Sequence, residues 1–116
     1  MTKHEIIDYV VDHYKTNPRS ITSGGLCRYN GLNGEKCAFA ILCSNPKELI
    51  EWKDADTLIN AGIAKLKPKF DGHSAFFYKQ IQNLHDDNTY WNKTPEGNEL
   101  SQRGIEKVNE LKEYHK

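Results

Sequence analysis

Apolar residues near the start of the chain follow the spacing of an amphipathic helix. These residues are Ile6, Ile7, Val10, Val11 and Tyr14. Thr2 and Glu5 fit a capping box at the start of this helix, where each side chain satisfies a free backbone amide. Asn17, followed by Pro18, is expected to end it, because proline disfavours helical geometry in the residue before it. A polar loop is expected from residue 19 to residue 25.

Two apolar runs follow, and they predict a β-hairpin. Residues 26–30 and 35–42 flank Asn33 and Gly34, a dipeptide typical of a two-residue hairpin turn. Both faces of the second run are apolar, which is typical of a strand buried on both sides. We therefore expect this strand to lie in the centre of the core.

Further helices are expected in the second half of the chain. Asn45, Pro46 and Glu48 favour a helix over 46–52. Asp56 is a predicted cap for a second short helix, which Gly62 would end. Residues 65–72 contain a proline and resemble a linker or a lid.

The last part of the chain carries two more helical patterns. Phe77, Ile81 and Leu84 support a helix over 73–86, and the final helix is expected to begin at Thr94-Pro95. Gly104 should weaken that final helix by about 1 kcal/mol relative to alanine. The predicted fold class is α+β: an N-terminal helix, a small antiparallel β-hairpin or sheet, then several short helices, in a single domain over residues 1–116.

Composition places the chain among ordinary globular proteins and limits the classes of partner that we expect. Its 116 residues are 37% hydrophobic and 28% charged, and the 16 basic and 16 acidic residues balance. Because nucleic-acid binding usually needs a basic excess, no nucleic-acid partner is predicted. No apolar stretch approaches the roughly 20 residues of a membrane span, so no membrane partner is expected either. A small sheet with exposed edges would favour a homo-oligomer.

The start of the chain has no secretory signal pattern, and the three cysteines are an odd number. Both features favour reduced thiols and a cytoplasmic location, which is the host cytoplasm if a phage encodes the chain.

Cys27 and Cys37 flank the predicted hairpin. An odd-length loop centred on Leu32 would place them opposite each other, whereas a two-residue loop would pair Cys37 with Asn30. The two thiols could form a metal or redox site, but the close C-x-x-C pairs typical of zinc sites are absent. Two buried, core-packing cysteines are the favoured interpretation. No metal or other cofactor is therefore predicted.

Several motifs resemble those of a largely uncharacterised family of small bacterial and bacteriophage proteins. The shared elements are C-x-Y at Cys27 and Tyr29, G-x-K-C-A from Gly34 to Ala38, Q-x-x-H-D at Gln82, His85 and Asp86, and Trp91. The agreement extends over residues 3 to 91 but weakens at FAILCSNPKELIEW (39–52), where the family has a different turn. The resemblance implies a phage setting, in which proteins of this size often interfere with host machinery.

A second group of residues has the chemistry of a polar site. Gln82 and His85 are three residues apart on a helix and share one face. A histidine beside a carboxylate suits a general base, an activator of Cys37 or a ligand-binding group. The alternative is that His85 and Asp86 form a polar helix end.

Aromatic and basic residues complete the predicted site. Tyr29 and Trp91 suit stacking on a ligand ring, although core packing is the alternative for Trp91. Lys36 would offset anionic charge. The full set of predicted ligand-binding residues is Tyr29, Lys36, Gln82, His85, Asp86 and Trp91.

These observations favour a phage-type, non-catalytic binding protein. Its partner would be a small polar ligand, such as a nucleotide-derived host signal sequestered to counter host defence, or a host protein. One alternative is a protein–protein inhibitor that acts through the exposed surface of its last helix. The other is a small enzyme with Cys37 as nucleophile and His85 as base.

Overall fold

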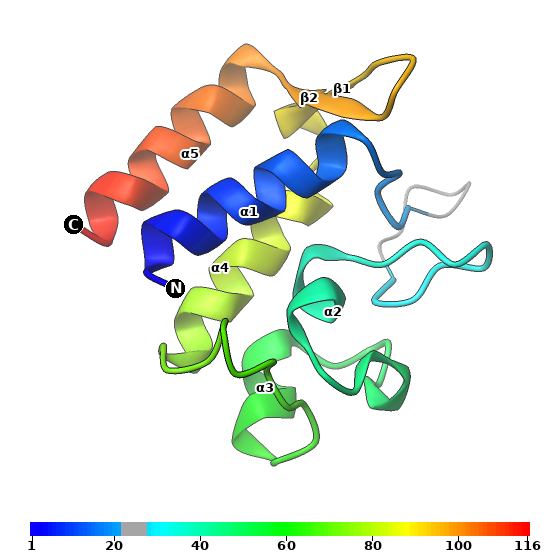
Figure 1. Cartoon of the computed structure of the whole chain (residues 1–116), viewed down its shortest axis with the longest axis vertical. Helices are drawn as coiled ribbons and strands as arrows, with labels where there is room; N and C mark the ends of the chain where they lie inside the picture. Colours follow the sequence, from blue (N-terminus) through cyan, green and yellow to red (C-terminus); the bar gives the residue numbers. More distant parts are fainter. Residues whose placement is uncertain (22–27) are drawn as a thin grey trace.

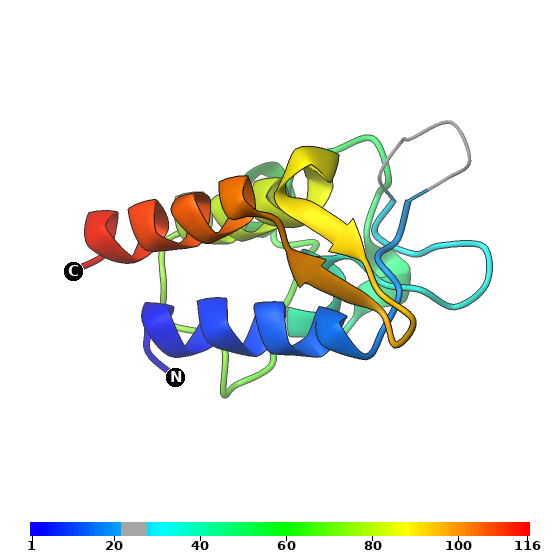
Figure 2. The same cartoon turned by 90° about the horizontal axis from the view of Figure 1, so that it is seen from above.

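The computed structural model describes residues 1–21 and 28–116. The elements in chain order are α1 (Lys3–Lys15), α2 (Ala38–Leu42), η1 (Pro46–Glu48), α3 (Ala55–Asn60), α4 (Ala75–Asp86), η2 (Asn88–Tyr90), β1 (Trp91–Lys93), β2 (Asn98–Leu100) and α5 (Gln102–Tyr114). Helices α1 and α5 lie side by side and run in opposite directions, so both ends of the chain lie at one end of this pair (Figures 1 and 2). Helix α4 packs against α1, α2, α3 and α5. The fold class is α+β, as expected.

Helix α1 confirms the local analysis of the first segment. The Thr2 side chain accepts a hydrogen bond from the Glu5 amide at 3.1 Å, and the Glu5 carboxylate accepts one from the Thr2 amide at 2.8 Å. The helix ends at Lys15, just before Asn17 and Pro18. Its apolar face is buried, so local capping and tertiary packing agree here.

The predicted second strand, over 35–42, is wrong, because most of it forms helix α2. Cys37 caps this helix, with its sulfur accepting from the Ala40 amide at 3.4 Å. All five helix residues are buried. A short run that is apolar on every side has no periodicity to separate a buried strand from a buried helix. Its expected place in the core is nevertheless confirmed.

The expected hairpin is reduced to a single bridge between Asn30 and Lys36. This pairing leaves residues 31–35 in the turn and sets the Cys37 amide on the Tyr29 carbonyl at 3.0 Å. The predicted register that would place Cys37 opposite Asn30 is not formed. Cys27 itself lies outside the described residues.

The two-stranded sheet lies elsewhere, between η2 and α5. β1 and β2 are antiparallel, with Trp91 opposite Leu100 and Lys93 opposite Asn98. Thr94-Pro95 therefore lies in the connecting turn and does not begin the final helix. Helix α5 begins at Gln102, where the Ser101 hydroxyl caps it by accepting from the Gly104 amide at 3.1 Å.

Three middle segments also differ from expectation. The helix predicted over 46–52 shortens to the single turn η1, and α3 is preceded by Asp54 as its cap residue in place of Asp56. The predicted stop at Gly62 agrees with the end of α3, since its φ of 74° suits glycine. The expected linker or lid at 65–72 is fixed instead, with its Phe70 side chain fully buried.

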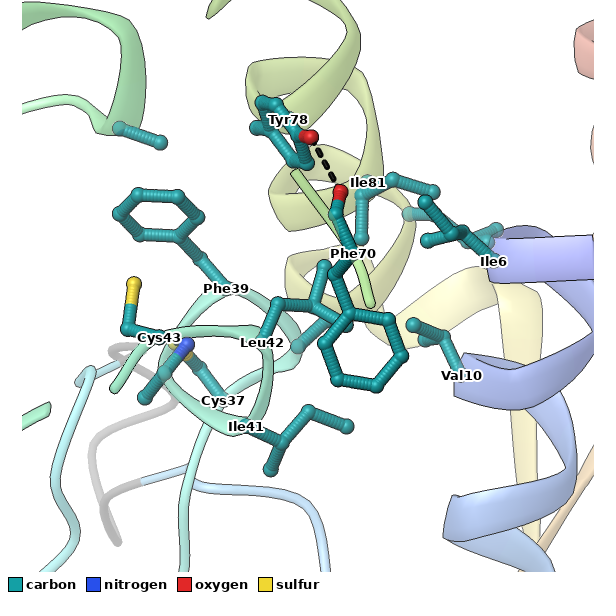
Figure 3. Packing of buried hydrophobic residues seen from close by; sticks show 14 of the residues in the cluster. Ile6, Val10, Cys37, Phe39, Ile41, Leu42, Cys43, Phe70, Tyr78 and Ile81 are labelled. Carbon is teal, nitrogen blue, oxygen red and sulfur yellow. Dashed lines mark hydrogen bonds between the residues drawn. The ribbon is translucent and has the colours of Figure 1, made fainter. Parts of the chain in front are cut away.

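The core gathers around α2 and α4 (Figure 3). Phe39, Leu42 and Phe70 lie close to Ile81, and the Tyr78 hydroxyl donates a hydrogen bond to the Phe70 carbonyl. In the described part of the chain, none of the helices combines the length and apolar character needed to span a bilayer.

At Gly104, the structure opposes the sequence-based expectation that alanine would stabilise the final helix. A Cβ at this position would lie 2.1 Å from the Tyr90 carbonyl oxygen and 3.0 Å from the Leu100 side chain. The missing side chain is what lets α5 pack closely on the backbone of η2. The helix-propensity gain of alanine is therefore outweighed by a steric clash with backbone.

We predict that Gly104→Ala lowers the free energy of unfolding by about 1–3 kcal/mol, the usual cost of overpacking. Asn109→Ala is the matched control, because Asn109 is exposed on the same helix and alanine there should be neutral or slightly stabilising. Chemical denaturation of the two variants measures both effects. Stabilisation by Gly104→Ala would contradict the close approach of α5 and η2.

Candidate functional site

Three of the predicted site residues, Gln82, His85 and Asp86, lie in the last turn of α4. The Gln82 amide nitrogen donates to the Asp86 Oδ1 at 2.5 Å, and its oxygen accepts from the Phe39 backbone amide at 3.0 Å. Gln82 therefore joins α4 to the start of α2 through its amide oxygen, while its amide nitrogen bonds within α4. This buried side chain holds two elements together.

The protonation state of His85 follows from its two partners. The Ser20 backbone amide donates to Nε2 at 3.2 Å, so Nε2 must carry the lone pair. The proton of the neutral ring then lies on Nδ1, which donates to the Asp86 Oδ1 at 2.8 Å. His85 is fully buried, and its two nitrogens are already paired by these contacts.

This arrangement leaves His85 unsuited to general-base catalysis. The lone pair that would accept a substrate proton is already directed at the Ser20 amide. Burial of the ring lowers the pKa of His85, and the nearby Asp86 only partly opposes that effect. Holding the chain together is therefore the role that its geometry supports.

Cys37 is likewise placed as a core residue (Figure 3). Its side chain is fully buried, and burial raises the pKa of the thiol well above its usual range. A nucleophilic cysteine needs the opposite, an accessible and stabilised thiolate. Among the described residues, no hydrogen bond joins Cys37 to His85.

Trp91 is buried, as the core-packing alternative for this residue predicts. Its indole nitrogen donates to the Leu84 carbonyl at 2.9 Å, and the Arg19 guanidinium lies 5.5 Å from the ring centroid. Tyr14 packs edge-on against it at 5.9 Å. The ring is therefore largely covered by the protein, and its remaining surface lines a separate hollow beside Arg19 and Asn88.

Lys36 lies apart from the end of α4. Its carbonyl accepts from the Tyr14 hydroxyl at 2.6 Å, and its side chain lines a different hollow, beside His13, Asn17 and Glu35. The six predicted residues therefore do not form one site. Three of them, Tyr29, Gln82 and Asp86, line a common cleft.

That cleft, here called the Trp52 cleft, has a volume of about 160 Å³. It lies between the turn after η1, the start of α3 and the outer face of α4. The lining residues are Tyr29, Glu51, Trp52, Lys53, Asp54, Ala55, Lys79, Gln82, Asn83 and Asp86. Half of these residues come from the segment 51–55, at and after the end of the helix predicted over 46–52.

Trp52 is the most unusual of these residues, because 83% of its surface is exposed. The residues on either side of it are fixed. The Glu51 carboxylate accepts from the Tyr29 amide at 2.7 Å, and the Lys53 carbonyl accepts from the Tyr29 hydroxyl. The indole is thus displayed by an anchored turn at the edge of the cleft. The sequence signal was present only as a tryptophan in a strongly polar segment, EWKDAD.

Burial is the main reason that the pKa of Tyr29 is raised, and Cys37 is the next largest cause. The carboxylates of Asp54, Asp86 and Glu51 raise it further. On the rim, Lys79 lies 3.7 Å from the Asp54 carboxylate.

The described residues contain no group of three or more histidine, cysteine or acidic side chains positioned to hold a metal ion. Comparisons with protein-family models, with curated proteins and with solved structures find no significant match.

The buried, neutral state of His85 makes acid pH destabilising. The folded pKa lies below the ordinary value of 6.5, so below that value the unfolded chain binds more protons than the folded chain. The free energy of unfolding should therefore fall as pH drops below 6.5, by at most about 1.4 kcal/mol per pH unit for this group. His13 and His115 contribute in the same direction, since burial lowers the pKa of each.

Denaturation at a series of pH values measures this slope, and ¹⁵N NMR of the imidazoles assigns it. We expect His85 to remain the Nδ1-protonated tautomer at pH 6.5. His13→Gln should remove only part of the slope. An Nε2-protonated His85 would contradict the hydrogen bond from Ser20.

Proposed function

We propose that this protein is a non-catalytic binding protein that holds a small polar ligand in the Trp52 cleft. The observation that carries the proposal is the exposed Trp52, held by an anchored turn beside a polar cleft that includes Tyr29, Gln82 and Asp86. Tryptophan is enriched where binding energy concentrates. An apolar surface next to polar groups is what a small ligand site requires.

The catalytic alternative has less support. His85 has its lone pair engaged by the Ser20 amide, and Cys37 is a buried helix cap with a raised pKa. Both predicted catalytic groups already have structural partners. A binding function needs neither of them to move.

The resemblance to phage proteins adds a more specific expectation. On that basis the ligand would be a nucleotide-derived host signal and the biological role would be counter-defence. This part stays a prediction, and nucleotides belong in any ligand panel.

A protein–protein inhibitor is a second candidate, favoured by two exposed aromatic rings. Phe76 on α4 and Tyr114 on α5 lie 6.5 Å apart between ring centroids, and both are largely exposed. Tyr114→Ala should weaken capture of a host protein under this alternative. The same variant should leave small-ligand binding in the Trp52 cleft unchanged.

The main proposal is tested by NMR titration of the ¹⁵N-labelled protein with a panel of small polar compounds that includes nucleotides. The chain has two tryptophans, so the buried Trp91 indole serves as an internal reference for the exposed Trp52 indole. A true ligand should shift the Trp52 signal and leave Trp91 nearly unchanged. Trp52→Ala should weaken binding at least roughly tenfold, within the range of hot-spot truncations.

Leu32→Ala is the matched control, since Leu32 is also highly exposed but does not line the cleft. Variants of His85 and Trp91 are poor tests, because both side chains are buried and hold the fold. Binding that survives Trp52→Ala, or a panel in which no compound shifts the Trp52 signal, would refute the proposal.

A further inference from the structure

We propose that the Trp52 cleft selects a ligand through a cationic end, an ammonium or guanidinium group, and not through a phosphate or carboxylate. This inference rests on the proposed function and adds the chemical class of the ligand. It draws on three observations: the size of the cleft, the charges around it and the display of Trp52.

The size of the cleft restricts what it can hold. Its volume of about 160 Å³ is below the roughly 300–1,000 Å³ of pockets that enclose a drug-sized molecule. A compact head group therefore fits, with the remainder of the ligand outside. A whole nucleotide would not be enclosed, so the ligand class inferred here differs from the nucleotide-derived signal that the resemblance to phage proteins suggests.

The charges around the cleft favour a positive head group. Three carboxylates line it, on Glu51, Asp54 and Asp86, against two lysines. One of the lysines, Lys79, is already beside the Asp54 carboxylate. The three carboxylates also raise the pKa of Tyr29, after the larger effects of burial and Cys37.

The carboxylates are held by different structural constraints. Glu51 accepts the amides of Tyr29 and Asn30, at 2.7 and 3.2 Å. Asp54 makes no side-chain hydrogen bond to the start of α3, and its side chain is 70% exposed. Asp54 is therefore the carboxylate best able to approach a ligand without loss of the fold.

Trp52 supplies the aromatic face. An ammonium or guanidinium group is attracted to the negative face of an indole, and tryptophan is the strongest of the aromatic side chains in this interaction. Because Trp52 lines the same cleft as the three carboxylates, a cation in the cleft would lie near both an aromatic face and an acid. An anionic group would meet repulsion from those acids.

The test uses four probes that share a butyl chain and differ in their charged end. These are butylammonium, butylguanidinium, pentanoate and butyl phosphate, each titrated into the full chain while the two indole signals are followed by NMR. AMP is added as a nucleotide probe. We expect the two cations to shift the Trp52 indole and the three anions to leave it unchanged.

Variants with opposite expected effects make the test sharper. Asp54→Asn should weaken butylammonium binding roughly fivefold, the upper effect expected for one exposed charge pair. Lys79→Gln should strengthen it, since it removes a competing cation from Asp54. Asp71→Asn is the control, because Asp71 is an exposed acid outside the cleft.

The outcomes separate this inference from the proposed function. If an anion shifts Trp52 and the cations do not, the cation preference is wrong while small-ligand binding stands. If no probe and no panel compound shifts Trp52, or if Trp52→Ala changes nothing, both proposals fail. An unchanged affinity in both Asp54→Asn and Lys79→Gln would also overturn the cation preference.

Discussion

The last turn of α4 is the point on which the rest of the structure depends. Four donors from other segments converge there: the Phe39 amide on the Gln82 oxygen, the Ser20 amide on the His85 ring, the Arg19 guanidinium on the His85 carbonyl, and the Trp91 indole on the Leu84 carbonyl. These contacts join one helix end to the segment after α1, to α2 and to β1. Unpaired buried donors cost about 1–3 kcal/mol each, so this turn constrains three separate parts of the chain.

The same turn explains why a polar cluster in a sequence can be mistaken for a binding site. Gln82, His85 and Asp86 have the chemistry of a site, and in the structure they use it on one another and on backbone amides. Buried polar networks of this kind stabilise a fold only when every member is satisfied. Of the three residues, Asp86 has the most accessible side chain, at 34%. It connects the network to the Trp52 cleft.

The parts of the fold that the sequence predicted well are those with local causes. Helix α1 has its own capping box and an apolar face, and α4 has a helical pattern that ends at Asp86. Helix α2 had no such signal, because its buried run is apolar on every side and its cap is a cysteine. The strands β1 and β2 have three residues each, too few to show alternation, and their pairing depends on distant contacts. One of these distant contacts is made by the buried Asn98 at the start of β2, whose side-chain amide donates to the carbonyls of Tyr14 and Asn17.

The candidate site shows the same division between features with a local cause in the sequence and features that depend on tertiary packing. Residue type and spacing predicted Tyr29, Gln82 and Asp86, which line one cleft. They also predicted Lys36 and Trp91, which tertiary packing places elsewhere. Trp52 could not be found, because what distinguishes it is exposure, and exposure is decided by tertiary packing. An exposed apolar residue alone is common on protein surfaces.

The case for Trp52 therefore depends on its support and not on its exposure alone. A tryptophan left in water forgoes burial worth about 1.5–3 kcal/mol for a large apolar side chain, and a flexible turn could recover part of this by folding the ring inward. Here the turn is held on both sides: Glu51 accepts the Tyr29 and Asn30 amides, and the Lys53 carbonyl accepts the Tyr29 hydroxyl. Tyr29 is in turn buried against Phe39 in the core. The backbone on both sides of Trp52 is thus coupled to the same core that α4 organises, so the exposed ring extends from an ordered turn and not from a flexible one.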